Sequence, residues 1–257
     1  MHLSLAPSAN IQNRILQGND ANGVATWAIL PPTYDPQTAT PWIIYNHGFG
    51  QTISSILTDP AHNLFVQSLA SAGFIVMASE YRSLTCWGNM ECTSDIANLQ
   101  TRWRAQLNLS SQPFVIGESM GGIVTWNAIS HGALKPLAVV GIYPACSLDA
   151  MYGTEAFVPT IEAAYSFTSP SGYISATQGF DPLLTPPSTF VDIPIEMWAS
   201  YSDRTVVRLQ NEDPFAKAIN AAGGHVAIHT SHGNHGDPSN LDSAAVISFF
   251  SSRMSAM

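Results

Sequence analysis

Short apolar runs alternate with segments of helix length along most of this 257-residue chain. Runs such as Ile-Val-Met-Ala at 75–78 are continuously apolar, as strands are when both faces of their sheet are covered. Parallel strands need long crossover connections, which are usually helices. The alternation therefore predicts the α/β class, with a mostly parallel central sheet flanked by helices on both faces.

The bounds of the expected elements follow from these runs and from the Gly, Pro and polar residues that interrupt them. No repeat or charged linker divides the chain, so residues 1–257 are expected to form a single domain. We expect strands at 26–30, 42–45, 74–78, 113–116, 137–142, 193–199 and 226–229. We expect helices at 63–72, 95–107, 123–130, 213–222 and 241–253, the second with Asp95 in its N-cap region.

Residues 149–192 break the alternation, because no β-α unit can be drawn through them. The segment is rich in Pro, Gly and Ser, and a structureless loop of this length is uncommon in a compact domain. We expect a small cap or lid of short helices over the carboxyl edge of the sheet; an insertion away from any site is the alternative. Its seven aromatic residues, some of which we expect to face the site, are Tyr152, Phe157, Tyr165, Phe167, Tyr173, Phe180 and Phe190.

Composition excludes several classes of protein. Hydrophobic residues make up 46% of the chain and charged residues 11%, the reverse of the balance in disordered chains. The net charge of -9 is a poor match for a nucleic-acid backbone. No apolar run approaches the roughly 20 residues of a membrane span. Residues 1–7 lack the basic start and apolar core of a signal peptide. We expect a soluble protein. The sequence leaves open its compartment, secretion included, and its oligomeric state.

Cysteine usage is sparse, with three residues and no Cys-x-x-Cys motif. Cys86 and Cys92 flank a short loop, so a local disulfide and two free thiols are both compatible with the sequence. Cys146 follows an expected strand and is interpreted as a small core residue.

The motif Gly-Glu-Ser-Met-Gly at 117–121 matches Gly-x-Ser-x-Gly. An apolar strand leads into it and a helical segment leads out, which is the setting of a nucleophile elbow. In such a turn Ser119 projects its hydroxyl above the sheet, and the amide of Met120 points to the place where an oxyanion forms. An ordinary glycine-rich turn with a solvent-facing serine is the alternative.

A serine hydroxyl needs a base, and the base needs an orienting acid. Asp203 follows the expected strand at 193–199, and His235 precedes the last expected helix. The chain order Ser119, Asp203, His235 is the order of triads that accompany a nucleophile elbow. We therefore expect these three residues to be catalytic.

Other candidates for the base and the acid are less well placed. His232 is an alternative base, whereas His225 and His229 are expected at an edge or on the surface. The crowding of these histidines raises the question of a metal site. No acidic or cysteine partner motif accompanies them, so we expect no metal. Among the acids, Asp213 falls within an expected helix, Asp192 precedes its strand, and Asp237 is too close to His235 in sequence.

Four features together resemble the α/β-hydrolase family, on its esterase, lipase and acyl-peptidase side. They are Asn-His-Gly-Phe-Gly at 46–50, the Gly-Glu-Ser-Met-Gly-Gly elbow, Asp203, and Gly-Asn-His-Gly at 233–236. The resemblance covers about 26–253 and implies that the Phe49 amide is the second oxyanion donor, while His47 supports that turn. The triple-glycine oxyanion loop of many lipases is absent, so bulky tertiary-alcohol esters are not implied.

The resemblance and the residues together predict a serine hydrolase that cleaves carboxylic esters through an acyl-enzyme, with no cofactor. Small-molecule or polymer-borne esters are the expected partners. A chain of this length favours ester over peptide substrates, because prolyl-type peptidases usually carry an additional propeller domain. A polysaccharide acetyl or feruloyl esterase, a polyester hydrolase, an acyl-peptidase and a catalytically silent binding protein of the same fold stay open as alternatives.

Overall fold

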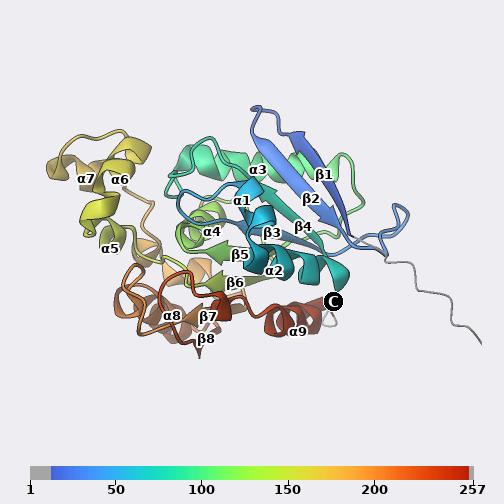
Figure 1. Ribbon diagram of the computed structural model, residues 1–257. Helices are drawn as coiled ribbons and strands as arrows, with labels where there is room; N and C mark the ends of the chain where they lie inside the picture. The colour runs from blue at the N-terminus through green and yellow to red at the C-terminus, as the bar shows by residue number, and fades with distance from the viewer. Residues whose placement is uncertain (1–12, 255–257) are drawn as a thin grey trace, which may run out of the picture.

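The computed structural model describes residues 13–254, which contain one eight-stranded sheet of order β1-β2-β4-β3-β5-β6-β7-β8 (Figure 1). β1 and β2 pair antiparallel, as do β2 and β4, and every other pairing is parallel. This arrangement confirms the mostly parallel sheet expected from the sequence. The strands are β1 Arg14–Asn19, β2 Ala25–Leu30, β3 Trp42–Asn46, β4 Ile75–Ser79, β5 Phe114–Glu118, β6 Ala138–Ile142, β7 Ile195–Ala199 and β8 Val226–Thr230.

Helices cover both faces of the sheet, and each face carries its own hydrophobic core. Alternate residues of β3 show the division: Trp42 and Ile44 pack on the side of α3, α4 and α8, whereas Ile43 and Tyr45 pack on the side of α1, α2 and α9. The α-helices are α1 Ile53–Thr58, α2 Pro60–Ser71, α3 Met90–Arg104, α4 Met120–Ser130, α5 Leu148–Tyr152, α6 Val158–Tyr165, α7 Tyr173–Ala176, α8 Glu212–Ala221 and α9 Ser243–Met254.

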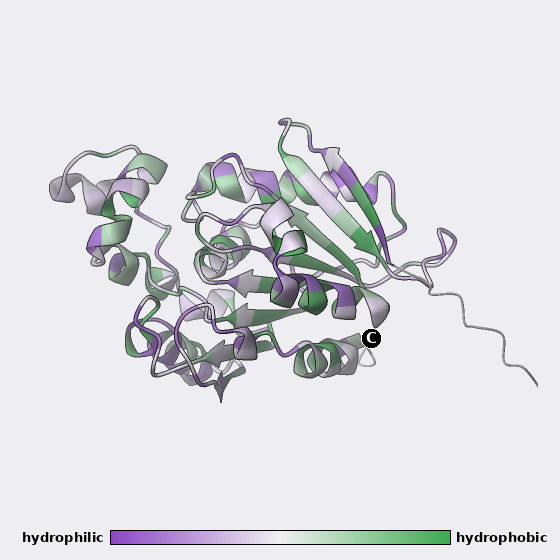
Figure 2. Ribbon diagram, in the orientation of Figure 1, coloured by the Kyte–Doolittle hydropathy of each residue, from purple (hydrophilic) through white to green (hydrophobic). Residues whose placement is uncertain are grey.

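The middle of the sheet explains why the apolar runs were sufficient to locate it. β3, β4, β5 and β6 are buried at every position, and they are green along most of their length in Figure 2. A strand with both faces covered has no polar side to present to water, so its sequence is apolar throughout. Because β3 to β8 pair parallel to one another, their carboxyl ends lie together at one edge of the sheet.

Two expectations about the first half of the chain were wrong or incomplete. α3 begins at Met90 with Asn89 as its N-cap, whereas Asp95 lies inside the helix, fully buried, where its carboxylate bonds to Arg82. Strand β1 was not expected, because it pairs only with β2 and its side chains are mostly exposed or half-buried. A strand with that exposure lacks the apolar run by which the other strands were identified.

The segment 149–192 folds into short helices, among them α6 and α7. In Figure 1 these helices lie on the side to which the arrowheads of β5 and β6 point. Most of the aromatic residues of this segment pack on one another or on the core: Tyr152 stacks on Tyr173 at a centroid distance of 4.4 Å, and Phe190 meets Trp126 at 6.0 Å. The aromatic residues of the segment thus pack partly on one another and partly on the core that covers the sheet.

All three cysteines are buried as free thiols, and Cys146 is the core residue that its position indicated. None of the helices between residues 13 and 254 has the length and apolar character that a membrane-spanning segment requires. Residues 1–7, in which no signal peptide is expected, lie outside the described residues.

Candidate active site

Ser119 occupies a sharp turn between β5 and α4. Its backbone has φ 52° and ψ -121°, a left-handed conformation that a residue with a side chain rarely adopts. The Ser119 carbonyl holds this turn by accepting hydrogen bonds from the amides of Gly122 and Ala145, both at 2.8 Å. The strained backbone thus presents the side chain at the carboxyl edge of the sheet.

The glycines of the motif allow the turn to pass close to its neighbours. A Cβ on Gly121 would overlap the backbone of Asn46 and His47, and one on Gly117 would lie 2.7 Å from Thr125 Oγ1. The Gly-x-Ser-x-Gly pattern is therefore a packing requirement of this turn.

The structure brings Ser119, His235 and Asp203 together in one chain of hydrogen bonds. The Ser119 hydroxyl donates to His235 Nε2 at 2.8 Å, and His235 Nδ1 donates to Asp203 Oδ2 at 2.8 Å. They come from the ends of β5, β7 and β8, and 116 residues separate the serine from the histidine. The arrangement is that of a nucleophile, a base and an orienting acid.

Asp203 is fixed from its other side. It is 3% exposed, and its Oδ1 accepts hydrogen bonds from the amides of Thr205 at 2.8 Å and Val206 at 3.0 Å. These bonds leave Oδ2 directed at His235, whose ring is also packed edge-on against Tyr143 at a centroid distance of 4.6 Å. The carboxylate and the aromatic ring together restrict the orientation of the imidazole.

The loop after β3 lies beside Ser119. A Cβ on Gly48 would be 3.2 Å from Ser119 Cβ, so the loop can approach this closely because Gly48 has no side chain. The Gly48 amide donates to Gln51 Oε1 at 2.7 Å, whereas the Phe49 amide has no acceptor within residues 13–254. Met120 is the first residue of α4, so its amide has no acceptor in the helix either.

His47 is buried beneath this loop and lies away from the reacting groups. Its Nδ1 donates to the Gly48 carbonyl at 3.0 Å, and its ring stacks on Tyr81 at 4.3 Å. Burial lowers the pKa of His47, so the ring is neutral at pH 7. This placement is the supporting role that the resemblance implies.

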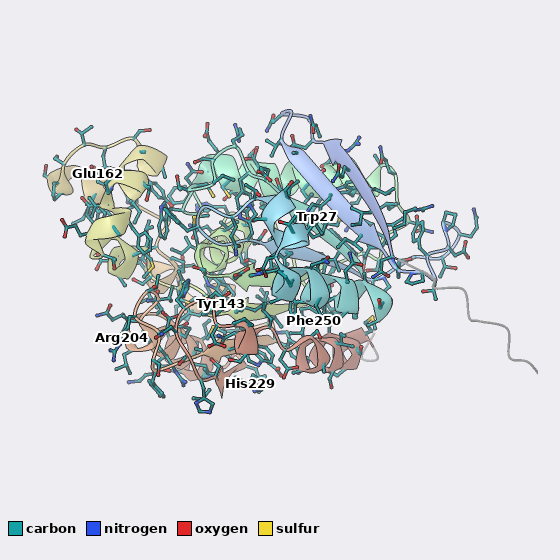
Figure 3. All side chains as sticks on the ribbon, viewed as in Figure 1. Trp27, Tyr143, Glu162, Arg204, His229 and Phe250 are labelled. Carbon is teal, nitrogen blue, oxygen red and sulfur yellow. The ribbon has the colours of Figure 1, made fainter. Side chains whose placement is uncertain are left out.

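The remaining C-terminal histidines are not brought to Ser119. His229 lies on β8 at the outer edge of the sheet (Figure 3). It bonds to Glu196 at 3.0 Å and stacks on Trp198. The rings of His225 and His232 have no polar partner among the described residues. Within residues 13–254, no group of three or more His, Cys, Asp or Glu side chains is arranged to hold a metal ion.

A cavity of about 320 Å³ opens at Ser119. One wall is aromatic, because Phe49 and Phe157 pack together at 5.3 Å and both contact Trp87. Among the described residues, Phe157 is the one aromatic residue of the segment 149–192 that lines this cavity. The lining residues are Gly48, Phe49, Gln51, His62, Glu118, Ser119, Tyr143, Phe157, Thr205, His235 and Gly236.

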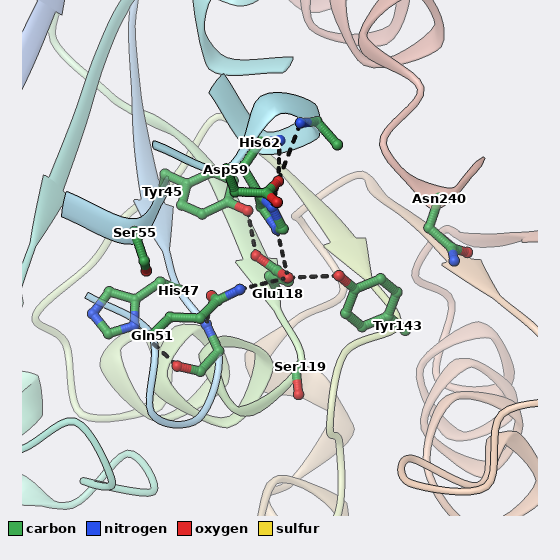
Figure 4. Close-up of polar contacts among 12 residues, drawn as sticks. Tyr45, His47, Gln51, Ser55, Asp59, His62, Glu118, Ser119, Tyr143 and Asn240 are labelled. Atoms are coloured by element: carbon green, nitrogen blue, oxygen red, sulfur yellow. Dashed lines mark hydrogen bonds and ion pairs between the residues drawn. The ribbon is translucent and has the colours of Figure 1, made fainter. Parts of the chain in front are cut away.

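Another part of the lining is polar and was not anticipated from the sequence. Figure 4 shows Glu118, the residue before the nucleophile, at the centre of a cluster of hydrogen bonds. Its carboxylate accepts bonds from Gln51, His62, Tyr143 and Tyr45. The one signal available in the sequence was a charged residue at the end of an otherwise apolar strand.

No family model matches this sequence, and no curated protein matches it significantly. Comparison with solved structures gives many matches at low sequence identity. A puromycin-hydrolyzing peptidase from Mycobacterium tuberculosis has 19% identity and a TM-score of 0.75, over 97% of this chain and 41% of that one. An acylaminoacyl peptidase from Pyrococcus horikoshii has 17% identity and a TM-score of 0.72, over 93% of this chain and 41% of that one.

A third match is close to this chain in length. TT1662 from Thermus thermophilus has 13% identity and a TM-score of 0.69, over 94% of this chain and 98% of that one. The chain therefore spans about two fifths of the two peptidases and nearly all of TT1662. Together with the strand order and the elbow, these matches show that the chain has the α/β-hydrolase fold.

The packing of the turn yields a prediction about Gly121. The substitution Gly121→Ala should lower the free energy of unfolding by about 1–3 kcal/mol or more, because the added methyl group has no space beside the backbone of Asn46. Gly153→Ala is the matched control, since the nearest atom to its Cβ would be 3.4 Å away. Urea unfolding measures both, and equal midpoints would contradict the packing argument.

Proposed function

We propose that this protein is a serine hydrolase that cleaves carboxylic esters through an acyl-enzyme intermediate. The observation that carries the proposal is the hydrogen-bonded chain from Ser119 through His235 to Asp203, with both links at 2.8 Å. A catalytically silent protein of this fold has no need for a buried acid, an oriented imidazole and a strained serine in one line.

The geometry supports a defined role for each group. Ser119 Oγ attacks the acyl carbon while His235 Nε2 takes its proton, and the His235 imidazolium then protonates the leaving alcohol. Asp203 accepts from Nδ1 throughout, which holds the tautomer that leaves Nε2 free. Water then attacks the acyl group with His235 as its base, and Ser119 is regenerated.

The two amides without acceptors support an oxyanion hole. The Phe49 amide belongs to the loop beside Ser119, and the Met120 amide belongs to the residue that follows the nucleophile. Gly48 is the poorer choice, since its amide already donates to Gln51. Each oxyanion donor is expected to contribute about 2.7–4 kcal/mol to stabilising the tetrahedral intermediate.

The cavity favours a small substrate. Its volume of about 320 Å³ is at the lower end of the roughly 300–1,000 Å³ of ligand pockets, which suits a compact ester better than an extended peptide. The aromatic wall of Phe49 and Phe157 would bind an apolar acyl or alcohol group, with the segment 149–192 as a cap on that side. A peptidase is the second candidate, because two of the similar structures are described as peptidases.

A substrate panel with a nucleophile variant tests the proposal. The protein should hydrolyse p-nitrophenyl esters faster than peptide p-nitroanilides, and Ser119→Ala should lower kcat by about 10⁶-fold. A fluorophosphonate should label Ser119 and no other serine, as mass spectrometry of the labelled peptide would report. Faster hydrolysis of the anilides would favour the peptidase, and no labelling at Ser119 would refute both enzymes.

Two histidine variants test the assignment of the base. His235→Ala should cost nearly as much activity as Ser119→Ala, because His235 is the residue bonded to the serine hydroxyl. His232→Ala should leave kcat within about twofold, since its ring is hydrogen-bonded to neither Ser119 nor Asp203, which both bond to His235. An inactive His232→Ala beside an active His235→Ala would reverse the assignment.

The aromatic wall is tested by Phe157→Ala. Removing this ring takes apolar contact area from the cavity, at about 25 cal/mol for each Å². The Michaelis constant should therefore rise more for butyrate and longer esters than for acetate, with kcat changed little. Ile174→Ala, on the same segment but 81% exposed, is the control. An unchanged ratio of long-chain to acetate kcat/KM would remove Phe157 from the substrate site.

A further inference from the structure

An ion pair between His62 and Glu118 lies at the polar wall of the Ser119 cavity. His62 Nε2 is 3.1 Å from Glu118 Oε1, and His62 Nδ1 is 2.7 Å from Asp59 Oδ1. Both ring nitrogens must carry a proton to donate to both carboxylates. The contacts therefore fit the doubly protonated imidazolium.

The ionisation of both partners agrees with this geometry. Burial lowers the pKa of His62, but the bonds and charges of Glu118 and Asp59 outweigh burial and raise this pKa to about 9. Burial raises the pKa of Glu118, but His62 and the bonds from Tyr143 and Tyr45 outweigh burial and lower it to about 2. At neutral pH the pair is charged on both sides.

Glu118 is connected through one side chain to the loop after β3 that contains Gly48 and Phe49, called the oxyanion loop below. Gln51 Nε2 donates to Glu118 Oε1 at 3.2 Å, while Gln51 Oε1 accepts the Gly48 amide at 2.7 Å. The two ends of this amide thus join the residue before Ser119 to the residue before Phe49. A displacement of the Glu118 carboxylate would be passed directly to the loop.

Glu118 is connected to the imidazole of His235 through Tyr143. The Tyr143 hydroxyl donates to Glu118 Oε1 at 2.5 Å, and its ring packs edge-on against His235 at 4.6 Å and 63°. Tyr143 has a left-handed backbone with φ 37°, which its amide helps to hold by donating to the Trp198 carbonyl at 2.7 Å. The strained backbone places this ring between the carboxylate and the imidazole.

We propose that Glu118 and protonated His62 are positioning residues that hold the oxyanion loop and the His235 ring in place beside Ser119, through Gln51 and Tyr143. The proposal rests on the proposed hydrolase function, and neither residue is assigned contact with reacting atoms. A neutral His62 can donate to only one of its two carboxylates. Its lone pair would then face the other carboxylate, the cluster would rearrange, and the loop and the ring would shift with it.

His62 is the group of this cluster that titrates in the alkaline range. The charged groups in contact with it are Asp59, the N-cap of α2, and Glu118 at the end of β5. Tyr45 on β3 and Tyr143 after β6 reach the same cluster by donating to Glu118. Burial and the charge of Glu118 raise the pKa of both tyrosines far above the usual value, so their hydroxyls remain donors. The reaction rate should therefore fall as the pH rises through about 9, where His62 loses its proton.

The pH dependence of kcat in His62 variants tests the proposal. With a p-nitrophenyl acetate assay from about pH 6 to about pH 10, the wild-type protein should show an alkaline limb. His62→Gln should lower kcat about 10–100-fold at neutral pH with little change in KM, and should lack that limb. His62→Lys keeps a cation that loses its proton only near pH 10.4, so it should recover part of kcat and hold that rate through pH 9, where the wild-type rate falls.

The control is His229→Gln, which removes a His–Glu pair between β8 and β7 at the edge of the sheet and should leave kcat and its pH profile unchanged. A second measurement, of thermal stability, does not depend on catalysis. The pKa of His62 rises from 6.5 to about 9 on folding. The stability that protonated His62 contributes is therefore full below about pH 6.5 and is lost as the pH rises through about 9. The Tm of the wild-type protein should fall more between these values than that of His62→Gln.

These readouts separate failure of the positioning role from failure of the hydrolase proposal. An active wild-type protein whose His62→Gln variant keeps kcat and the alkaline limb would overturn the positioning role alone. An inactive wild-type protein with unlabelled Ser119 would overturn the hydrolase, and the positioning role with it. If His62→Gln does not fold, two other variants test the positioning role. Gln51→Ala and Tyr143→Phe each remove one hydrogen bond to Glu118 and should lower kcat without raising KM. Unchanged kcat in both variants would also overturn the positioning role.

Discussion

The left-handed backbone of Ser119 is the constraint on which the rest of the site depends. The turn is held by two amides on the Ser119 carbonyl, one from α4 and one from the loop after β6. It can form only where neighbouring backbones come close, and Gly121 and Gly122 allow that approach. The same turn fixes the start of α4. It therefore sets three things at once: the position of the Ser119 hydroxyl, the direction of the Met120 amide and the position of the helix.

The sheet then brings the other groups to this turn. The loop that contains Gly48 and Phe49 follows β3, which pairs with β5, while Asp203 and His235 follow β7 and β8. Strand β6 lies between the two pairs, and the turn after it supplies Tyr143, which fills the space between the nucleophile strand and His235. Parallel strands that end at one edge thus bring together residues that are far apart in sequence.

The sequence predicted what a local pattern encodes and missed what depends on distant partners. The strands of the sheet centre were predictable because both of their faces are buried, whereas β1 was not, because its side chains are largely exposed. Asp95 resembled a helix cap, but its carboxylate is buried against Arg82, and Asn89 is the cap. That Ser119, Asp203 and His235 lie together was predictable from motif and chain order. The contact between His62 and Glu118 spans 56 residues and leaves no pattern in either segment.

The cost of burying charge explains why the cluster beneath the nucleophile needs a role. Only 11% of the residues are charged, yet a carboxylate with 3% of its side chain exposed lies next to the nucleophile and is paired with a histidine. Desolvating two such charges can cost more than their attraction returns, so a buried ion pair is weak evidence of a gain in stability. What the pair supplies is geometry: Glu118 accepts hydrogen bonds from β3, from the oxyanion loop, from α2 and from the turn after β6. A single carboxylate bonded to four separate segments fixes their relative positions, and an apolar side chain of the same volume could fill the space without fixing them.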